Sequence, residues 1–154
     1  MGFNRRFDHN FARLRELVDQ EKIGKLELVK ITSRDPEPPP AEYAASSGGM
    51  FLDMTIHDFD MARFLAGSDI ESLYVQAACS WIPPSGRRRR GFRRYHPEFK
   101  NGALGVIDNS RKAVYGYDQR VEVFASEGCA EDQNDTPNTA VLSTADGAVH
   151  GVAT

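Results

Sequence analysis

Asp53 and His57 are the pair of residues whose types and spacing could do chemistry. They lie four residues apart in a run that favours a helix, so both side chains would project from one helical face. A carboxylate beside an imidazole fixes the tautomer of the ring and raises its basicity, as a general base acting on a hydroxyl requires. The alternative is a solvated Asp/His pair on a surface helix. The apolar residues that crowd the pair favour catalysis: Met50, Phe51, Leu52, Met54 and Ile56.

Metal binding is another interpretation of this segment. Asp53, His57, Asp58 and Asp60 all carry ligand atoms. Asp58 would lie on another face of the helix, however, and the chain has no second His-rich segment to supply partners. The two cysteines lie in unrelated contexts, which indicates neither a zinc site nor a disulfide framework. We therefore expect no metal site.

A basic segment interrupts an otherwise acidic chain. Lys and Arg total 19 against 22 Asp and Glu, a net charge of −3, and six of the arginines fall within Arg87–Arg94. Phe92 and Tyr95 lie in or beside this segment, a combination that nucleic-acid-binding proteins use. Such proteins usually carry positive charge over a whole domain, so one short segment is little support for that function.

Length and composition fit one globular domain. The 154 residues are 40% hydrophobic, enough for a sizeable core. No apolar run approaches the roughly 20 residues of a membrane helix. No apolar segment follows Arg5 and Arg6, as it would in a secretory signal, so a cytoplasmic location is expected. The chain also lacks a Gly-x-Gly-x-x-Gly motif after a strand and a Walker loop, so it should bind no dinucleotide phosphate by itself.

The N-terminal half predicts a helix, a strand and a second helix. Four apolar residues recur at helical spacing and would share one face: Phe7, Phe11, Leu14 and Val18. The helix that they predict begins near Asp8, a good N-cap, and ends by Gly24. Leu26–Thr32 is rich in strand formers, and the prolines that follow it predict a stiff loop. Met50–Leu65 favours a helix that ends at Ala66-Gly67.

The C-terminal half predicts strands and turns. Four segments have strand character: Leu73–Ala78, Ala103–Asp108, Arg120–Phe124 and a last hairpin from Ala140 to Val149. Asn101-Gly102 is a hairpin-type turn. Ile82–Pro97 has neither a helical nor a strand period and predicts a loop. Helices early and hairpins late together predict an α+β domain with a largely antiparallel sheet.

Three short segments carry side chains that could bind a polyol or an anion. Arg5-Arg6 and Ser33–Pro36 offer hydrogen-bonding groups. Tyr115-Gly116-Tyr117 places two phenols around a glycine, which can bring an aromatic face and a hydroxyl to a sugar-like ring. Each segment also fits an ordinary solvated surface.

Taken in order, these segments resemble the inositol 2-dehydrogenases of the Gfo/Idh/MocA oxidoreductase family. The resemblance covers residues 1–80 and 100–128 and rests on ordered motifs: Gly2–Asp8, Gly24-Lys25, Thr32–Pro36, Gly48-Gly49, Asp53-x-x-x-His57-Asp58-x-Asp60-x-x-Arg63, Asn109–Arg111 and Tyr115–Asp118. The Asp-x-x-x-His helix marks the family broadly. The Arg-Asp-Pro and Tyr-Gly-Tyr-Asp segments point to the inositol branch.

The resemblance implies a fold, a cofactor and an assembly. Residues 1–154 would form a single incomplete domain, the C-terminal substrate domain, with an open sheet and helices on one face. The cofactor would be NAD, bound mainly by a Rossmann domain that, with the catalytic Lys, would lie upstream of Met1. The isolated chain is therefore expected to be inactive. The intact enzyme would form a homo-oligomer through the sheet.

The resemblance also assigns roles to individual residues. His57 would take the proton from an inositol hydroxyl while hydride leaves the same carbon for the nicotinamide. Asp53 would orient His57 and contact a substrate hydroxyl. Arg5 and Asp35 would line the polyol site, and Tyr117 would contact the ring from another element. The substrate would be myo-inositol or a similar polyol, and Ser at position 33 leaves the isomer open.

Residues 81–100 depart from the family pattern. An acidic loop and an alternating apolar strand are expected there, but the sequence has Pro83-Pro84 and the Arg87–Arg94 segment. Arginines at both inward and outward strand positions cannot face a core, so we expect this segment to leave the sheet. Either a reading-frame slip or a genuine insertion would produce it. The alternative function for the whole chain is a non-catalytic oligomerisation or binding module with weak nucleic-acid affinity through Arg87–Arg94.

Overall fold

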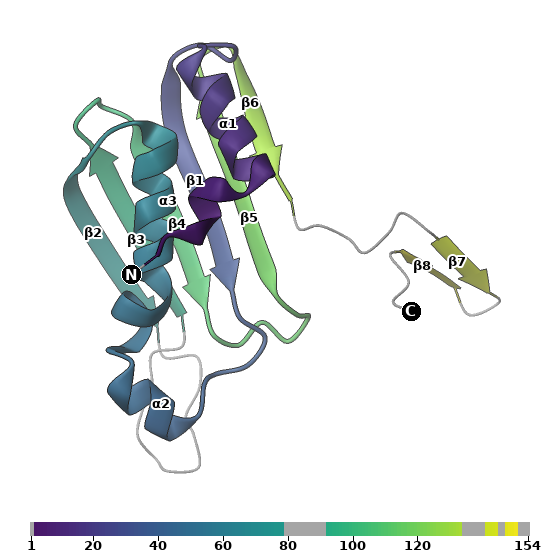
Figure 1. Ribbon diagram of the computed structural model, residues 1–154. Helices are drawn as coiled ribbons and strands as arrows, with labels where there is room; N and C mark the ends of the chain where they lie inside the picture. Colours follow the sequence, from purple (N-terminus) through teal and green to yellow (C-terminus); the bar gives the residue numbers. More distant parts are fainter. Residues whose placement is uncertain (1, 79–91, 134–140, 145–146, 151–154) are drawn as a thin grey trace.

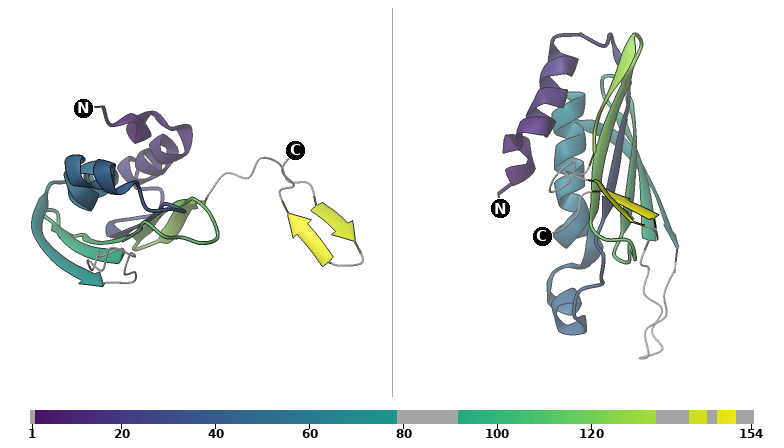
Figure 2. Two further views of the ribbon diagram at one scale, coloured as in Figure 1. Left: turned by 90° about the horizontal axis from the view of Figure 1, so that it is seen from below. Right: turned by 90° about the vertical axis from the view of Figure 1, so that its right-hand side faces the viewer.

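A six-stranded sheet with helices on one face dominates the computed structural model (Figures 1 and 2). The structure describes residues 2–78, 92–133, 141–144 and 147–150. The strands run in the order β2-β3-β4-β1-β5-β6, and among the described residues only β1 and β4 pair in parallel. Their bounds are β1 Leu26–Arg34, β2 Ile70–Ala78, β3 Phe92–Phe99, β4 Leu104–Ser110, β5 Asp118–Ala125 and β6 Gly128–Asp132. The predicted α+β class, with a largely antiparallel sheet and helices on one face, is confirmed.

The first helix, α1, spans His9–Asp19 and begins where its N-cap predicts. The Asp8 carboxylate accepts hydrogen bonds from the backbone N–H groups of Asn10 and Phe11. Phe11 is buried with Leu14, but Phe7 is 88% exposed, so the prediction that Phe7 shares the buried face is wrong. Phe7 ends a short 3-10 turn, η1 (Asn4–Phe7), and extended Asp8 separates the turn from the helix.

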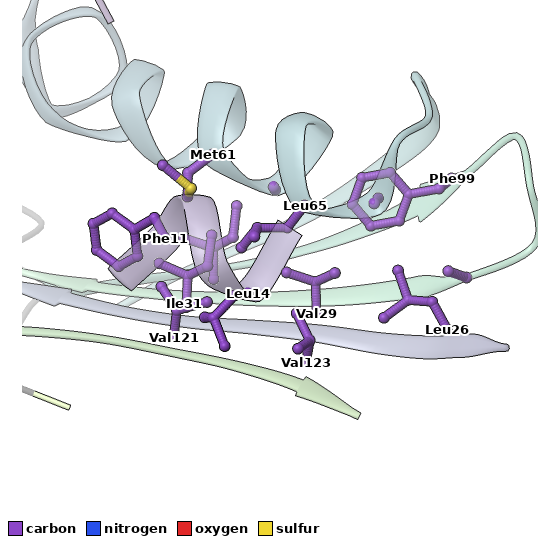
Figure 3. Packing of buried hydrophobic residues seen from close by; sticks show 14 of the residues in the cluster. Phe11, Leu14, Leu26, Val29, Ile31, Met61, Leu65, Phe99, Val121 and Val123 are labelled. Carbon is purple, nitrogen blue, oxygen red and sulfur yellow. The ribbon is translucent and has the colours of Figure 1, made fainter. Parts of the chain in front are cut away.

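The second predicted helix forms, with a wider first turn than expected. A π-helical segment, η2, spans Phe51–Thr55 and continues as α3, Ile56–Ala66. Gly67 ends α3 in the left-handed conformation, as predicted. Figure 3 shows Met61 and Leu65 of α3 directed at the strands below, and both are 0% exposed. None of the helices in the described part of the chain is long and apolar enough to cross a membrane.

Strand β3 corrects the prediction of a loop over Ile82–Pro97. Residues 92–99 pair with β2 on one side and β4 on the other. Tyr95, Pro97 and Phe99 alternate as buried residues, a period-two pattern that the preceding arginines obscured in the sequence. Residues 79–91, with Arg87 to Arg90, lie outside the described residues.

The last two arginines of the Arg87–Arg94 segment stay in the sheet, contrary to expectation. The Arg93 guanidinium lies over the Phe51 ring, 4.4 Å from its centroid. Arg94 lies 3.9 Å from the Asp108 carboxylate. Stacking and ion pairing at the end of the strand therefore accommodate charges that the core would reject.

Besides β3, the helix α2 and the strand β6 were not predicted from the sequence. The short helix α2, Ala41–Ser46, follows the proline-rich loop. Strand β6, which contains Cys129, pairs with β5 at the edge of the sheet. The predicted C-terminal hairpin is confirmed: β7, Val141–Thr144, pairs with β8, Gly147–His150, as a separate two-stranded sheet. α2 matters most for function, because it supplies a side chain to the candidate site described below.

Pro97 interrupts the ladder between β3 and β4, and a glycine accommodates it. The paired residues skip from Tyr95↔Ile107 to Glu98↔Leu104, since proline has no N–H to donate. A Cβ atom at Gly105 would lie 2.4 Å from the Pro97 Cγ. The opposing glycine therefore creates the space that Pro97 occupies.

Replacing Gly105 by alanine should lower the free energy of unfolding by about 1–3 kcal/mol, the usual cost of overpacking. Gly128→Ala is the matched control, since its Cβ would meet nothing closer than 3.4 Å. Urea denaturation of both variants measures the effect. Equal stability of the two variants would show that β3 does not pack on β4 as described.

Candidate functional site

The parallel pair β1 and β4 brings two sequence motifs together. Because their carboxyl ends meet at one edge of the sheet, Asp35 after β1 lies beside Arg111 after β4. Two backbone hydrogen bonds of 2.9 Å fix Asp35 there, from its own N–H to Ser110 and from the Ala113 N–H to its carbonyl. The Arg111 Nε lies 3.9 Å from the Asp35 Oδ2.

Asp53 joins this cluster from η2. Its carboxylate accepts a 2.6 Å hydrogen bond from the Tyr43 hydroxyl on α2 and another from the Arg111 Nη2. Burial tends to raise the pKa of Asp53, but these two hydrogen bonds and the charges of Arg111 and His57 hold it below its ordinary value. Asp53 is therefore an ionised acceptor at neutral pH.

The same surroundings shift the pKa of Asp35 in the opposite direction from that of Asp53. Burial raises its pKa, against the attraction of Arg111 and Arg5, and the nearby Asp53 charge adds to the rise. Two carboxylates close enough to influence each other thus have pKa values shifted apart. Such pairs are typical of binding and catalytic sites.

His57 lies at the start of α3, half-buried, with the Phe3 ring packed edge-on at 5.9 Å between centroids. Its charge acts on Asp53, so the two groups are near each other. The described hydrogen bonds of the Asp53 carboxylate go to Tyr43 and Arg111, however, and none joins it to His57. The orientation of His57 by Asp53 remains a prediction.

Arg5 is held by a buried polar network. Its Nη1 donates to the Asp58 Oδ1 at 2.5 Å, and Asn109 Nδ2 donates to Asp58 Oδ2 at 2.8 Å. The Asn109 Oδ1 accepts a 2.9 Å bond from Thr55, whose hydroxyl lies 3.0 Å from the Tyr95 hydroxyl. One network therefore connects η1, η2, α3, β3 and β4.

Asp58 is the charged centre of that network and is 0% exposed. Burial raises its pKa, and Arg5, Asn109 and Ser33 oppose the rise. The aspartate that follows His57 thus serves as the anchor for Arg5. The nearby Asp60 forms a bidentate ion pair with a second arginine, because Arg6 donates to both of its carboxylate oxygens at 2.8 and 2.5 Å.

Tyr117 and Arg5 line one depression in the surface. It holds about 730 Å³ and is lined by Asn4, Arg5, Phe7, Asp8, Asn10, Phe11, Tyr117, Gln119, Asp132 and Gln133. His57 and Asp53 are not among these lining residues. The structure therefore brings Arg5 and Tyr117 together, and separately Asp35 and Asp53, with Arg5 acting electrostatically on Asp35.

Three of the residues that build this region have no role predicted from the sequence. Tyr43 and Arg111 contact the predicted site residue Asp53 directly. Asn109 contacts Asp58, which in turn holds Arg5. The signal for two of them was present, because Asn109–Arg111 was one of the ordered motifs. Among the described residues, no group of three or more His, Cys, Asp or Glu side chains could hold a metal ion.

Comparison with known proteins decides the family. A family model of the GFO/IDH/MocA C-terminal domain matches residues 11–131. The chain belongs to the GFO/IDH/MocA family. The matched residues include β1, η2, α3 and β4, and with them Asp35, Asp53, His57 and Arg111.

Similar proteins of this family include inositol dehydrogenases. The chain is 51% identical over 143 residues to myo-inositol 2-dehydrogenase of Thermotoga maritima, covering 92% of this chain and 43% of that protein. A probable dehydrogenase from the same organism superposes with a TM-score of 0.89 at 49% identity, over 97% of this chain and 46% of that one. A scyllo-inositol dehydrogenase from Lactobacillus casei, solved with NAD(H) and scyllo-inositol, gives a TM-score of 0.77 at 28% identity, with 97% and 46% covered. The GFO/IDH/MocA chain described here thus spans less than half the length of these relatives.

Replacing Thr55 by valine should destabilise the domain by about 1–3 kcal/mol, because Asn109 and Tyr95 would each keep a buried polar atom without its partner. Thr32→Val is the control, a like substitution at a buried threonine of β1 outside this network. Chemical denaturation compares the two. If Thr55→Val lowers the free energy of unfolding no more than Thr32→Val does, the hydrogen-bond network described above is contradicted.

Proposed function

We propose that this chain is the substrate-binding domain of an NAD-dependent inositol 2-dehydrogenase-like oxidoreductase. The enzyme oxidises a ring hydroxyl of myo-inositol or a similar polyol to a ketone. The observation that carries the proposal is the cluster of Asp35, Asp53 and Arg111 beside His57, within the segment that is half identical to a myo-inositol 2-dehydrogenase. An ionised Asp53 beside an imidazole, with Asp35 as a second oxygen acceptor, suits a substrate made of hydroxyl groups.

Each site residue has a defined task in this function. His57 removes the hydroxyl proton, Asp53 orients His57 and accepts a substrate hydroxyl, and Asp35 accepts another. Arg5 and Tyr117 bind the polyol from the depression that they share. NAD supplies the hydride acceptor, and the described residues of this chain offer it no dinucleotide fold. The part of the relatives that this chain does not span is the place for the cofactor.

The same proposal includes a homo-oligomer in the cytoplasm. The sheet face opposite the helices carries exposed apolar side chains: Tyr74 at 62%, Leu104 at 53% and Phe124 at 45%. The views in Figure 2 show no helix over that face. A second copy of the sheet would bury these side chains, which supports association through this face.

A chimera tests the proposal directly. In the Thermotoga relative, the segment matched by this chain is replaced by the chain itself, and NADH formation is followed with myo-inositol. The chimera should turn over, the isolated 154-residue chain should not, and His57→Ala in the chimera should lower kcat by about 10²–10⁴.

Exposed His9 on α1 provides the matched control, since His9→Ala should leave kcat unchanged. Circular dichroism and NAD binding check that each protein is folded. A folded, NAD-binding chimera without inositol-dependent turnover would overturn the proposal, and so would a His57→Ala variant as active as its parent.

A further inference from the structure

Arg111 connects two carboxylates that come from distant parts of the chain. Its Nη2 donates to Asp53 on η2, and its Nε faces Asp35 after β1 at 3.9 Å. The arginine is 9% exposed, whereas the Asp35 side chain is 37% exposed. The guanidinium is therefore a buried support, and Asp35 is the more exposed of its two carboxylates, since the Asp53 side chain is 16% exposed.

The Nε–H of Arg111 is buried and has no hydrogen-bond acceptor among the described residues. An unsatisfied buried donor costs about 1–3 kcal/mol, which an arginine serving only stability would avoid. The Asp35 carboxylate, 3.9 Å from Nε, is held by its backbone and keeps its side chain partly in solvent. Arg111 thus binds Asp53 firmly and leaves Asp35 free to accept another donor.

We propose that Arg111 is a positioning residue of the polyol site, which fixes Asp53 beside the backbone-held Asp35 so that the two carboxylates form a pair of acceptors for two hydroxyls of one substrate ring. This inference rests on the proposed function. Adjacent ring hydroxyls are donors at a fixed separation, and two carboxylates on one rigid guanidinium match such a pair. The groups that face the pair are Arg5, His57 and Tyr43.

The first test uses the 154-residue chain alone and does not depend on activity. The pKa of Asp53 is measured by carbon NMR of its carboxyl group. Arg111→Gln should raise that pKa, because the opposing effects of burial remain while the hydrogen bond and the charge are lost. Arg111→Lys should restore part of the lowering. Arg13→Gln, on the exposed face of α1, is the matched control and should change nothing.

The second test measures kinetics in the chimera. Arg111→Gln should raise the KM for myo-inositol at least tenfold, as expected for loss of a charge-assisted contact, with a smaller change in kcat. Arg111→Lys should recover part of the KM. Urea denaturation identifies any variant that is unfolded. If Arg111→Gln is unfolded, the KM of Arg111→Lys is compared with that of the unsubstituted chimera instead.

The outcomes separate this inference from the proposed function. An unchanged Asp53 pKa in Arg111→Gln would overturn the positioning role. A raised pKa with an unchanged KM would overturn the part that concerns substrate. If the unsubstituted chimera is folded but inactive, the proposed function fails, and the NMR titration alone decides whether Arg111 positions the two carboxylates.

Discussion

The buried carboxylate of Asp58 is the constraint on which the rest of the site depends. A charge with no exposure to solvent costs several kcal/mol unless an opposite charge and hydrogen bonds compensate it. Arg5 supplies the charge from η1 and Asn109 supplies a hydrogen bond from β4. The N-terminal segment, the helix α3 and the middle of the sheet must therefore converge at one point.

The parallel pairing of β1 with β4 extends this constraint to the candidate site. Ser33 and Asn109 are register partners, so both polar groups lie beneath α3 near the Asp58 carboxylate. Two residues further along the chain from Ser33 and Asn109, just past the ends of β1 and β4, Asp35 lies beside Arg111. The apolar core in Figure 3 fills the other end of the α3–sheet interface, which leaves polar chemistry at the carboxyl ends of the strands.

Local sequence signals predicted the elements that local interactions determine. The Asp8 N-cap, the strand after Gly24 and the left-handed Gly67 each act within a few residues, and each was found where expected. The strand β3 was not predicted, because its stability comes from pairing with β2 and β4 on both sides, whereas the arginines before it indicate solvent. Long-range pairing cannot be deduced from the composition of the segment itself.

The residues of the candidate site, too, could be predicted only where a local sequence pattern identifies them. Asp53 and His57 could be identified from a four-residue spacing, but Arg111 is 58 residues away from Asp53 in sequence and no local pattern connects them. The π-helical turn η2 also changes the geometry on which the spacing argument relied, because a wider turn rotates Asp53 relative to α3. Its carboxylate consequently meets Tyr43 and Arg111.

A double-mutant cycle on Arg5 and Asp58 tests the central claim most directly. The free energy of unfolding is measured for the chain, for Arg5→Ala, for Asp58→Ala and for the double variant. A buried pair that organises the site should give a coupling energy of about 2 kcal/mol or more. The exposed Arg63–Asp69 pair, measured in parallel, should show no significant coupling. A coupling between Arg5 and Asp58 as small as that of the exposed pair would contradict the account.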